Sequence, residues 1–357
     1  MELPSPLIAR KQHAASFRAS AIVSVAGSLL AALVATGCGG TADTPATTAV
    51  KSVTALVGGR VRTAPDAPDI AEGVVLVTDG RITAVGPRAD VRVPAHATVI
   101  DCAGATVTAA FWNTHVHFTG PPFREAATAP SAQLAEGLRA MLTSYGVVHV
   151  VDTGSFLPNT LALRRRVENG EIPGPSIVTA GAGFAPEGGS PYYILPARLP
   201  ELGDVARAGT AVDVQLDASA DVVKLFTGSW ARRDAIVVMP VEIVRAATEA
   251  AHRRGKLVIA HPSNSAGARA AIEGGVDILA HTFPSELDRR PWDRALPGMM
   301  RERGMALIPT LKLWPYELGK LGLPPAIIDT VLGNGQAQLR AFAEQGGKSC
   351  SAPTWGT

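Results

Sequence analysis

Residues 134–151, LAEGLRAMLTSYGVVHVV, place an amphipathic helix pattern directly before a buried apolar run. Five residues recur at the spacing of one helical face: Leu134, Leu138, Met141, Leu142 and Tyr145. The run VVHVV that follows is typical of a strand buried on both faces. Because this unit of helix and strand recurs along the chain after Phe111, we predict an α/β fold with parallel strands and crossover helices.

Seven strands are expected in this α/β part. The first begins at Phe111, the second is VVHVV, and the others have the sequences SIVTA, DVVKLF, KLVIA, VDILA and ALIPT. A helix is predicted between Pro240 and Gly255, because proline favours the first turn of a helix and glycine its end.

Residues 52–106 have a different pattern, in which short β-rich runs alternate with Gly, Pro and Asp. The pair Asp79-Gly80 between VVLVT and RITAV is a strong hairpin signal. We predict a small β module over residues 52–106 and an α/β domain over residues 107–347.

The first 38 residues have the layout of a secretory signal, in which basic residues and an apolar run over residues 21–35 precede Cys38. The apolar run is too short to span a bilayer comfortably. Ala35-Thr36-Gly37-Cys38 resembles a bacterial lipobox, whose cysteine is acylated; an ordinary cleaved signal or an uncleaved anchor is the alternative. We expect a lipoprotein-type signal over residues 1–38, a flexible linker over residues 39–51, and export to the bacterial cell envelope, lipid-anchored or periplasmic.

Composition and charge exclude several classes of protein. The chain has 357 residues, 46% of them hydrophobic and 18% charged, which excludes intrinsic disorder. Lys and Arg number 33 against 31 Asp and Glu, so no basic excess is available for a nucleic-acid backbone. Three cysteines are too few and too scattered for a disulfide framework.

Four histidines and a lysine lie in or at the C-terminal ends of predicted strands, where α/β barrels place their catalytic groups: His115, His117, Lys224, His261 and His281. His115 and His117 are two residues apart, so on an extended backbone both rings project to one side and can bind one cation. Taken singly, a buried histidine bonded to a backbone carbonyl is the commoner explanation. The joint placement favours a metal site.

Several motifs then resemble the amidohydrolase superfamily. Residues 100–104 (IDCAG) and 111–117 (FWNTHVH) resemble its first motif, and the likeness continues over residues 146–152, 172–175, 220–226 and 275–281. The resemblance covers residues 52–347 and is greatest to the imidazolonepropionase-like and Xaa-Pro dipeptidase-like branch. It implies a (β/α)8 TIM barrel with a small β-sandwich built from both chain ends, and one or two divalent metal ions, with zinc as the expected metal.

The resemblance also implies roles for the five residues. His115 and His117 would bind one metal ion, Lys224 as a carbamate would bridge two, and His261 and His281 would complete the second site. The implied reaction is hydrolysis of a carbon–nitrogen bond in a small amide, cyclic amide or dipeptide by metal-activated water. A homo-oligomer is compatible with this family, and membrane contact is expected only through the lipid anchor.

The family motif Gly-Thr-Asp, whose Asp would bind metal and act as general base on the eighth strand, does not occur in the sequence. Residues 348–357 place Ser and Pro where a buried strand is expected. One choice of codons for this tail, read in a shifted frame, encodes Val-Leu-Phe-Gly-Thr-Asp-Val-Gly-Tyr. We therefore expect an aberrant tail, a barrel that lacks its last strand, no assignable catalytic residue, and impaired folding and activity.

Two alternatives come from other classes of function. Asp152-Thr153-Gly154-Ser155 resembles an aspartic protease active-site sequence, but no second Asp-Thr/Ser-Gly is present. The other alternative is a non-catalytic exported lipoprotein that retains the barrel as a binding scaffold. Residues 181–216 and 283–297 are expected to be either pocket-lining segments or solvent loops.

Overall fold

The computed structural model describes residues 52–64, 66–283, 286 and 291–350. The predicted signal, the linker, Cys38 and the tail after Cys350 lie outside these residues. Within the described part, no helix has both the length and the apolar character needed to cross a membrane.

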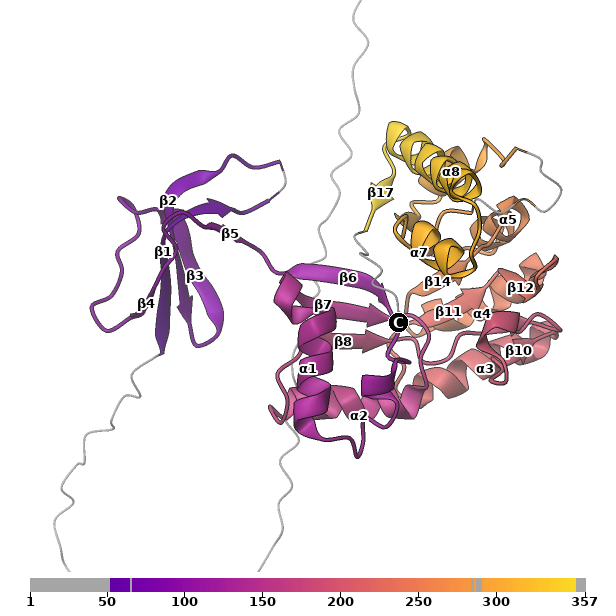
Figure 1. Cartoon of the computed structure of the whole chain (residues 1–357), viewed down its shortest axis with the longest axis horizontal. Helices are drawn as coiled ribbons and strands as arrows, with labels where there is room; N and C mark the ends of the chain where they lie inside the picture. Colours follow the sequence, from indigo (N-terminus) through magenta and orange to yellow (C-terminus); the bar gives the residue numbers. More distant parts are fainter. Residues whose placement is uncertain (1–51, 65, 284–285, 287–290, 351–357) are drawn as a thin grey trace, which may run out of the picture. The chain divides into compact units, whose positions relative to one another are not determined.

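The N-terminal module is one five-stranded sheet, coloured indigo to violet in Figure 1. Its strands are β1 (Val53–Arg62), β2 (Ile70–Thr78), β3 (Arg81–Pro87), β4 (Thr98–Asp101) and β5 (Thr106–Thr108). The order is β3-β2-β1-β4, and β5 also pairs with β1. Strands β2 and β3 run antiparallel to their neighbours, whereas β4 and β5 run parallel to β1. The described strands of the module thus form a single layer, and the sandwich stays a prediction.

The predicted hairpin is present between β2 and β3. Thr78 pairs with Arg81, and the two residues between them, Asp79 and Gly80, have φ angles of 50° and 75°. Positive φ at both central positions is the requirement of a type I′ turn, which Asp-Gly satisfies with little strain. This turn sets the register that buries one face of the sheet.

All seven predicted strands of the α/β part are present, and an eighth follows them. They are β6 (Phe111–Val116), β7 (Val147–Asp152), β8 (Ser176–Thr179), β11 (Val223–Phe226), β14 (Val258–His261), β15 (Ile278–Ala280), β16 (Ala306–Ile308) and β17 (Lys348–Ser349). The first three form one parallel sheet, β6-β7-β8, and the other five form a second, β11-β14-β15-β16-β17.

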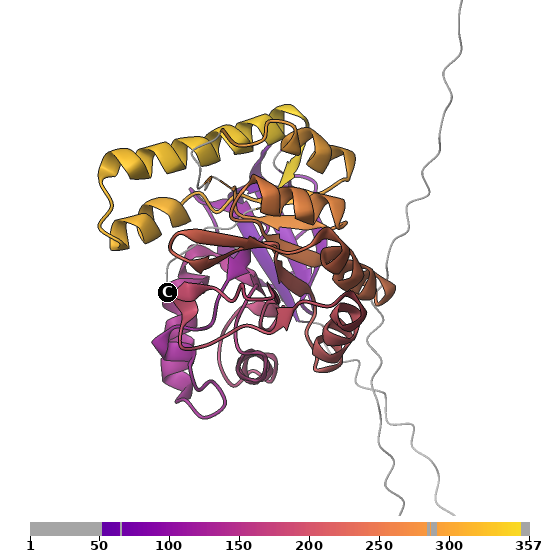
Figure 2. The same ribbon diagram turned by 90° about the vertical axis from the view of Figure 1, so that its right-hand side faces the viewer.

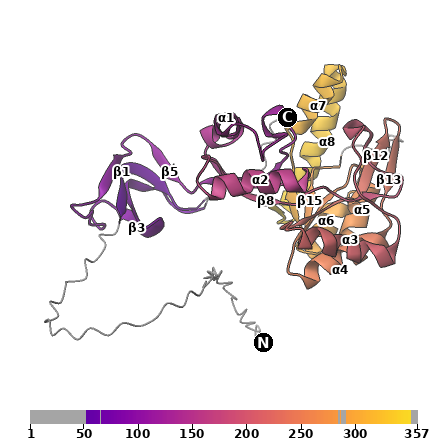
Figure 3. The ribbon, with the colours of Figure 1, turned by 90° about the horizontal axis from the view of Figure 1, so that it is seen from below.

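Helices alternate with these strands, as the sequence pattern predicts. They are α1 (Ser131–Met141), α2 (Leu157–Glu168), α3 (Val205–Asp217), α4 (Val241–Arg253), α5 (Ser265–Glu273), α6 (Leu296–Glu302), α7 (Leu313–Lys320) and α8 (Pro325–Glu344). Figure 2 shows α7 and α8 as a packed pair, and Figure 3 shows α3 beside α4. Short additional elements are η1 (Pro121–Phe123), η2 (Thr143–Tyr145), η3 (Tyr192–Ile194), β9 (Ala185–Pro186), β10 (Glu201–Leu202) and the hairpin β12 (Gly228–Arg232) with β13 (Ala235–Val238).

The predicted helical face in residues 134–145 is mostly confirmed. Leu134, Leu138 and Leu142 are fully buried in a core that includes Val147 and Val150 of the next strand. Tyr145 was expected on the same face, but that prediction is wrong, because 52% of it is exposed. The α-helix ends at Met141 and a short 3-10 turn follows, so the helical periodicity no longer holds at Tyr145.

The two parallel sheets are linked by the chain that follows β8. The backbone of Phe184 donates to the Lys224 carbonyl and accepts from the Phe226 amide, both at 2.8 Å. Phe184 therefore forms a parallel β-bridge with Leu225 of β11. The Asp221 amide adds a 2.8 Å bond to the Thr179 carbonyl. These bonds place the ends of β8 and β11 next to each other.

The eighth strand is short but present, which corrects the expectation that the chain lacks it. Lys348 and Ser349 pair in parallel with Ala306 and Leu307 of β16, and the Cys350 amide donates to the Leu307 carbonyl at 2.8 Å. Pairing uses backbone groups, so polar side chains do not prevent it. Both strand residues are exposed.

Candidate metal centre

The five candidate residues lie at the C-terminal ends of four parallel strands. His115 is in β6 and His117 follows directly after it; Lys224 is in β11; His261 is the last residue of β14, and His281 follows β15. The C-terminal ends of parallel strands meet at one edge of the sheet. The topology therefore gathers groups that lie up to 166 positions apart in the sequence, from 115 to 281.

The four imidazoles form a contiguous cluster. The ring of His281 lies 4.5 Å from that of His115 and 4.7 Å from that of His261, measured between centroids. The rings of His115 and His117 are 5.1 Å apart. His281 thus contacts His261 of the neighbouring strand β14 and His115 of β6, which belongs to the other parallel sheet, so the cluster spans the two sheets.

Lys224 is buried next to this cluster, with 1% of it exposed. Its Nζ lies 5.6 Å from the centre of the Phe226 ring, which stacks on His261 at 4.9 Å. Burial lowers the pKa of Lys224 to about 7, although Asp152 opposes the shift. A large fraction of this amine is therefore neutral near neutral pH, which an exposed lysine is not.

All four histidines are held in the neutral form. Burial lowers the pKa of His117 to about 4, and lowers those of His115, His261 and His281 well below the usual value. The neighbouring positive charge of Lys224 adds to each shift. Neutral imidazole is the form that binds a metal ion.

The hydrogen bond of His117 fixes which nitrogen carries its proton. Nδ1 of His117 lies 3.0 Å from the Gly154 carbonyl oxygen. A carbonyl only accepts, so Nδ1 carries the hydrogen and Nε2 of the neutral ring keeps its lone pair. The tautomer is assigned from this contact and leaves Nε2 available as a ligand atom.

Asn113 and His115 occupy the buried end of β6. The backbone amide of His115 donates to Oδ1 of Asn113 at 3.1 Å, and 1% of Asn113 is exposed. The Asn113 side chain therefore contacts the backbone of His115. Among the described residues, Nδ1 of His115 is buried and has no hydrogen-bond partner, an arrangement that proteins rarely tolerate without a ligand or water.

Two hydroxyl residues of the site were not identified from the sequence, Ser263 and Thr310. Ser263 Oγ lies 3.2 Å from Nε2 of His261, and Thr310 Oγ1 lies 2.5 Å from Nδ1 of His281. Ser263, His281 and Thr310 each follow one of three successive strands, β14, β15 and β16. All three have positive φ angles, of 51°, 76° and 42° respectively. Left-handed backbone outside glycine concentrates at functional sites. The only signal in the sequence was the position of Thr310 at the end of ALIPT.

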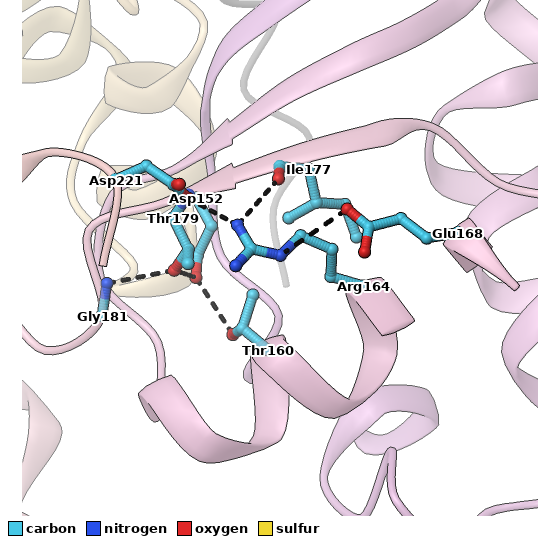
Figure 4. A network of polar contacts seen from close by, with 8 residues as sticks. All are labelled: Asp152, Thr160, Arg164, Glu168, Ile177, Thr179, Gly181 and Asp221. Atoms are coloured by element: carbon cyan, nitrogen blue, oxygen red, sulfur yellow. Dashed lines mark hydrogen bonds and ion pairs between the residues drawn. The ribbon is translucent and has the colours of Figure 1, made fainter. Parts of the chain in front are cut away.

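Asp152 is the last residue of β7, and its carboxylate accepts four hydrogen bonds. The donors are the Gly154 amide and the hydroxyls of Ser155, Thr160 and Thr179, at 2.6 to 3.2 Å. Figure 4 shows the Oδ2 side of this network, with Thr160 on α2 and Thr179 on β8. Burial raises the pKa of Asp152 although the four donors oppose the rise. No second carboxylate is among its partners, so the geometry disfavours a protease dyad.

The same view shows Arg164 on α2 paired with Asp221. Its Nη1 lies 2.6 Å from the Asp221 carboxylate, which also accepts the Thr179 amide at 2.9 Å. The run of three arginines at 164–166 by itself predicts solvated side chains at the end of a helix. That expectation is wrong for Arg164 and Arg166, whose side chains are 18% and 14% exposed, because each bonds to groups on another segment.

The donor set suits a divalent ion by residue type and protonation, because it offers neutral imidazoles and a partly neutral amine. In the part of the chain that is described, no group of three or more His, Cys, Asp or Glu side chains has the arrangement of a ready-made metal site. The rings instead contact one another by faces and edges. The buried Nδ1 of His115 and the free Nε2 of His117 are the atoms that a metal ion would satisfy.

Two segments, residues 181–216 and 283–297, were predicted to line a pocket or to be solvent loops. Part of residues 181–216 lines a cleft of about 960 Å³ between the start of α2 and α3, and none of the five candidate residues lines it. Residues 284–285 and 287–290 of the other predicted segment, 283–297, lie outside the described residues. Trp314 of α7 lies closer to the cluster, 6.4 Å from His281 between ring centres, and its Nε1 donates to Thr282 at 3.2 Å.

No family model matches the chain. It is 25% identical to a prolidase solved with N-methylphosphonate-L-proline, with a TM-score of 0.68 over 84% of this chain and 78% of the other. A structure described as an amidohydrolase has the same identity, a TM-score of 0.67 and the same coverage. These matches identify the chain as a structural relative of the amidohydrolase family. An enamidase from Eubacterium barkeri is 30% identical over 108 residues, which are 30% of this chain and 25% of the enamidase.

The amidohydrolase relatives support the mixed α/β architecture over most of the described chain. The chain matches only a quarter of the enamidase, so that protein's activity enters the argument below as support for a proposal.

Proposed function

We propose that this chain has the site of a metal-dependent hydrolase of carbon–nitrogen bonds in small amides, cyclic amides or dipeptides. One observation carries the proposal: four neutral histidines and a lysine of lowered pKa meet at the C-terminal ends of parallel strands. A bound divalent ion, with zinc as the expected metal, would polarise the scissile carbonyl and lower the pKa of water.

The histidines supply the ligand atoms in this proposal. His115 and His117 would bind one ion, with Nε2 of His117 free because its Nδ1 donates to Gly154. His261 and His281 would bind a second. The buried Nδ1 of His115, which has no partner in the described residues, supports a ligand role for this ring.

As a carbamate, Lys224 would be the ligand shared by the two sites. Its amine is partly neutral at pH 7, since burial lowers its pKa to about 7. A neutral amine attacks carbon dioxide to form a carbamate and releases one proton, which converts a cationic side chain into an anionic oxygen ligand. The burial of Lys224 thus supports the reaction by favouring the neutral amine, and the charge of bound metal ions would stabilise the anionic product.

Two lines support the substrate class. The prolidase relative was solved with N-methylphosphonate-L-proline, and the partial match is to an enamidase. Both names describe carbon–nitrogen bond hydrolysis in small molecules. We further propose low turnover for this chain, since the sequence contains no Gly-Thr-Asp motif to supply the general base of the family. We also propose that residues 1–38 direct export of the protein.

Metal loading and hydrolysis test the proposal together. The purified chain is incubated with zinc, desalted and analysed by mass spectrometry for metal, then assayed on Xaa-Pro dipeptides, N-acyl amino acids and cyclic amides. We expect about one to two zinc ions per chain and slow, chelator-sensitive hydrolysis. The variant His115→Ala should lose zinc, whereas His96→Ala, on the exposed surface of the N-terminal module, should not.

A wild-type chain that binds no zinc and hydrolyses none of these amides would contradict the proposal. Zinc binding without turnover would instead favour the alternative of a non-catalytic binding scaffold. Turnover that survives both chelation and His115→Ala would point to a different site.

A further inference from the structure

We propose that Asp152 is a positioning residue for His117, acting through the turn Asp152-Thr153-Gly154-Ser155. The inference rests on the proposed function in one respect, because it assigns His117 a ligand role. Three successive residues, the last of β6 and the two that follow it, are bonded to three successive residues of this turn. The turn therefore determines both where the His117 backbone lies and which way its ring faces.

The three bonds alternate between backbone and side chain. The Thr153 amide donates to the Val116 carbonyl at 3.0 Å, and Nδ1 of His117 donates to the Gly154 carbonyl at 3.0 Å. The Phe118 amide donates to Oγ of Ser155 at 2.8 Å. Together these bonds fix the residue before His117, the His117 ring itself and the residue after it.

The Asp152 carboxylate gives the turn its shape. Oδ1 accepts the Gly154 amide at 3.2 Å and the Ser155 hydroxyl at 2.6 Å, so one oxygen fixes both residues that bond to the His117 region. Asp152 is completely buried, which makes these bonds strong and the loss of either partner costly. Asx turns of this kind pin the backbone two residues ahead.

Glycine at position 154 is needed for a second reason. A Cβ placed there would lie 3.3 Å from Cε1 and 3.4 Å from Nδ1 of His117, a tight approach to the imidazole. The ring therefore packs against the backbone of the turn. This close approach is what lets the Gly154 carbonyl reach Nδ1.

The other carboxylate oxygen serves a separate purpose. Oδ2 accepts hydrogen bonds from the hydroxyls of Thr160 on α2 at 3.1 Å and Thr179 on β8 at 2.8 Å (Figure 4). Among the described contacts, neither hydroxyl bonds to the three residues that hold His117, which are Thr153, Gly154 and Ser155. These bonds anchor Asp152 to its surroundings. Loss of the Thr160 hydroxyl is therefore a matched control. It removes one hydrogen bond to the Asp152 carboxylate but none of the bonds that hold His117.

The expected consequence concerns the tautomer of His117. With the turn intact, Nδ1 carries the proton and Nε2 is the free ligand atom. When the turn relaxes, nothing selects Nδ1 over Nε2, and the two neutral forms should both be populated. A ligand ring in the wrong tautomer must first exchange its proton, so metal affinity falls; losses of about 10–100-fold are typical when such a supporting contact is removed.

Nuclear magnetic resonance of the metal-free protein at pH 7 tests this inference through the ¹⁵N shifts of the His117 ring, assigned with His117→Gln. Asp152→Asn and Ser155→Ala are compared with Thr160→Val. We expect a single Nδ1–H form in the wild type and in Thr160→Val, and mixed tautomers in the other two. Zinc titration should show dissociation constants weakened about tenfold or more in Asp152→Asn and Ser155→Ala.

A purely structural role would lower the melting temperature of all three variants and leave the tautomer and the zinc affinity unchanged, which would overturn the inference. If Asp152→Asn does not fold, Ser155→Ala carries the same test, because it removes the bond to Phe118 and one donor to Asp152. A wild type that binds no zinc contradicts the proposed function but leaves the tautomer measurement decisive for the positioning role.

Discussion

Thr310 and His281 meet through a 2.5 Å hydrogen bond between Oγ1 and Nδ1, and both residues have left-handed backbones, with φ angles of 42° and 76°. A β-branched residue at positive φ is strained. Thr310 is 1% exposed, so its hydroxyl has little access to water. The strain is compensated in part by the contact that orients His281.

Removal of this hydroxyl should therefore cost more than removal of the methyl group. Thr310→Val keeps the shape of the side chain and leaves Nδ1 of His281 without its partner, which should lower the free energy of unfolding by about 1–3 kcal/mol. Thr310→Ser keeps the hydroxyl and should lose only about 1 kcal/mol. Urea denaturation of both variants measures the difference. Equal stabilities would show that the hydrogen bond contributes nothing.

The sequence was sufficient to predict the alternation of strands and helices because burial imposes periodicity on it. Leu134 and Leu138 recur at helical spacing and are buried, and every predicted strand was found. The five candidate residues could be selected because strand ends converge in a parallel sheet. Local pattern and global topology agree in these places.

Other features depend on contacts between distant segments, which leave little local signal. Arg164 pairs with Asp221, 57 positions away, and was expected to be solvated. The turn after Asp152 resembles a protease motif, yet its carboxylate accepts four internal donors. Lys348 pairs with β16 through its backbone, whereas its polar side chain predicted that no strand would form there.

Stability of the metal-free protein should fall as the pH drops from about 6.5 to about 4. Burial lowers the pKa of His117 to about 4 in the folded state, against 6.5 for a solvent-exposed histidine. Between these values the unfolded chain binds more protons, so unfolding becomes easier as the pH falls. The full shift corresponds to roughly 3 kcal/mol from this residue, and the other three histidines act in the same direction.

Urea denaturation at pH 5, 6 and 7 measures this dependence, and His117→Gln should make it shallower. Asp152 opposes the trend at the acid end, because its pKa is raised in the folded state and folding there takes up a proton. Comparison with His117→Gln at each pH isolates the histidine. A variant with the same slope as the wild type would contradict the assignment.

The ion pair of Arg164 with Asp221 should stabilise the junction between the two parallel sheets. Asp221 also bonds to the backbone of Thr179, so loss of the guanidinium leaves a partly buried carboxylate with a weaker set of partners. Arg164→Met should lower the free energy of unfolding by about 1–3 kcal/mol. The neighbouring Arg165→Met, which changes an exposed side chain, should cost less than about 0.5 kcal/mol. Equal losses would show that the pair is not important.

Lys224 should react with carbon dioxide and should also make stability rise with pH above neutrality. Its pKa is about 7 in the folded state, against 10.5 for a solvent-exposed lysine, so the unfolded chain binds the extra proton between these values and stability increases across that window. Lys224→Met should remove this rise and, at pH 6, stabilise the fold by about 2 kcal/mol or more, because no buried ammonium remains.

Labelled ¹³C-bicarbonate at pH 8 should give a carbamate resonance in the wild type and in Lys256→Met but not in Lys224→Met. A resonance that persists in Lys224→Met would assign the carbamate to another amine and leave Lys224 without the bridging role.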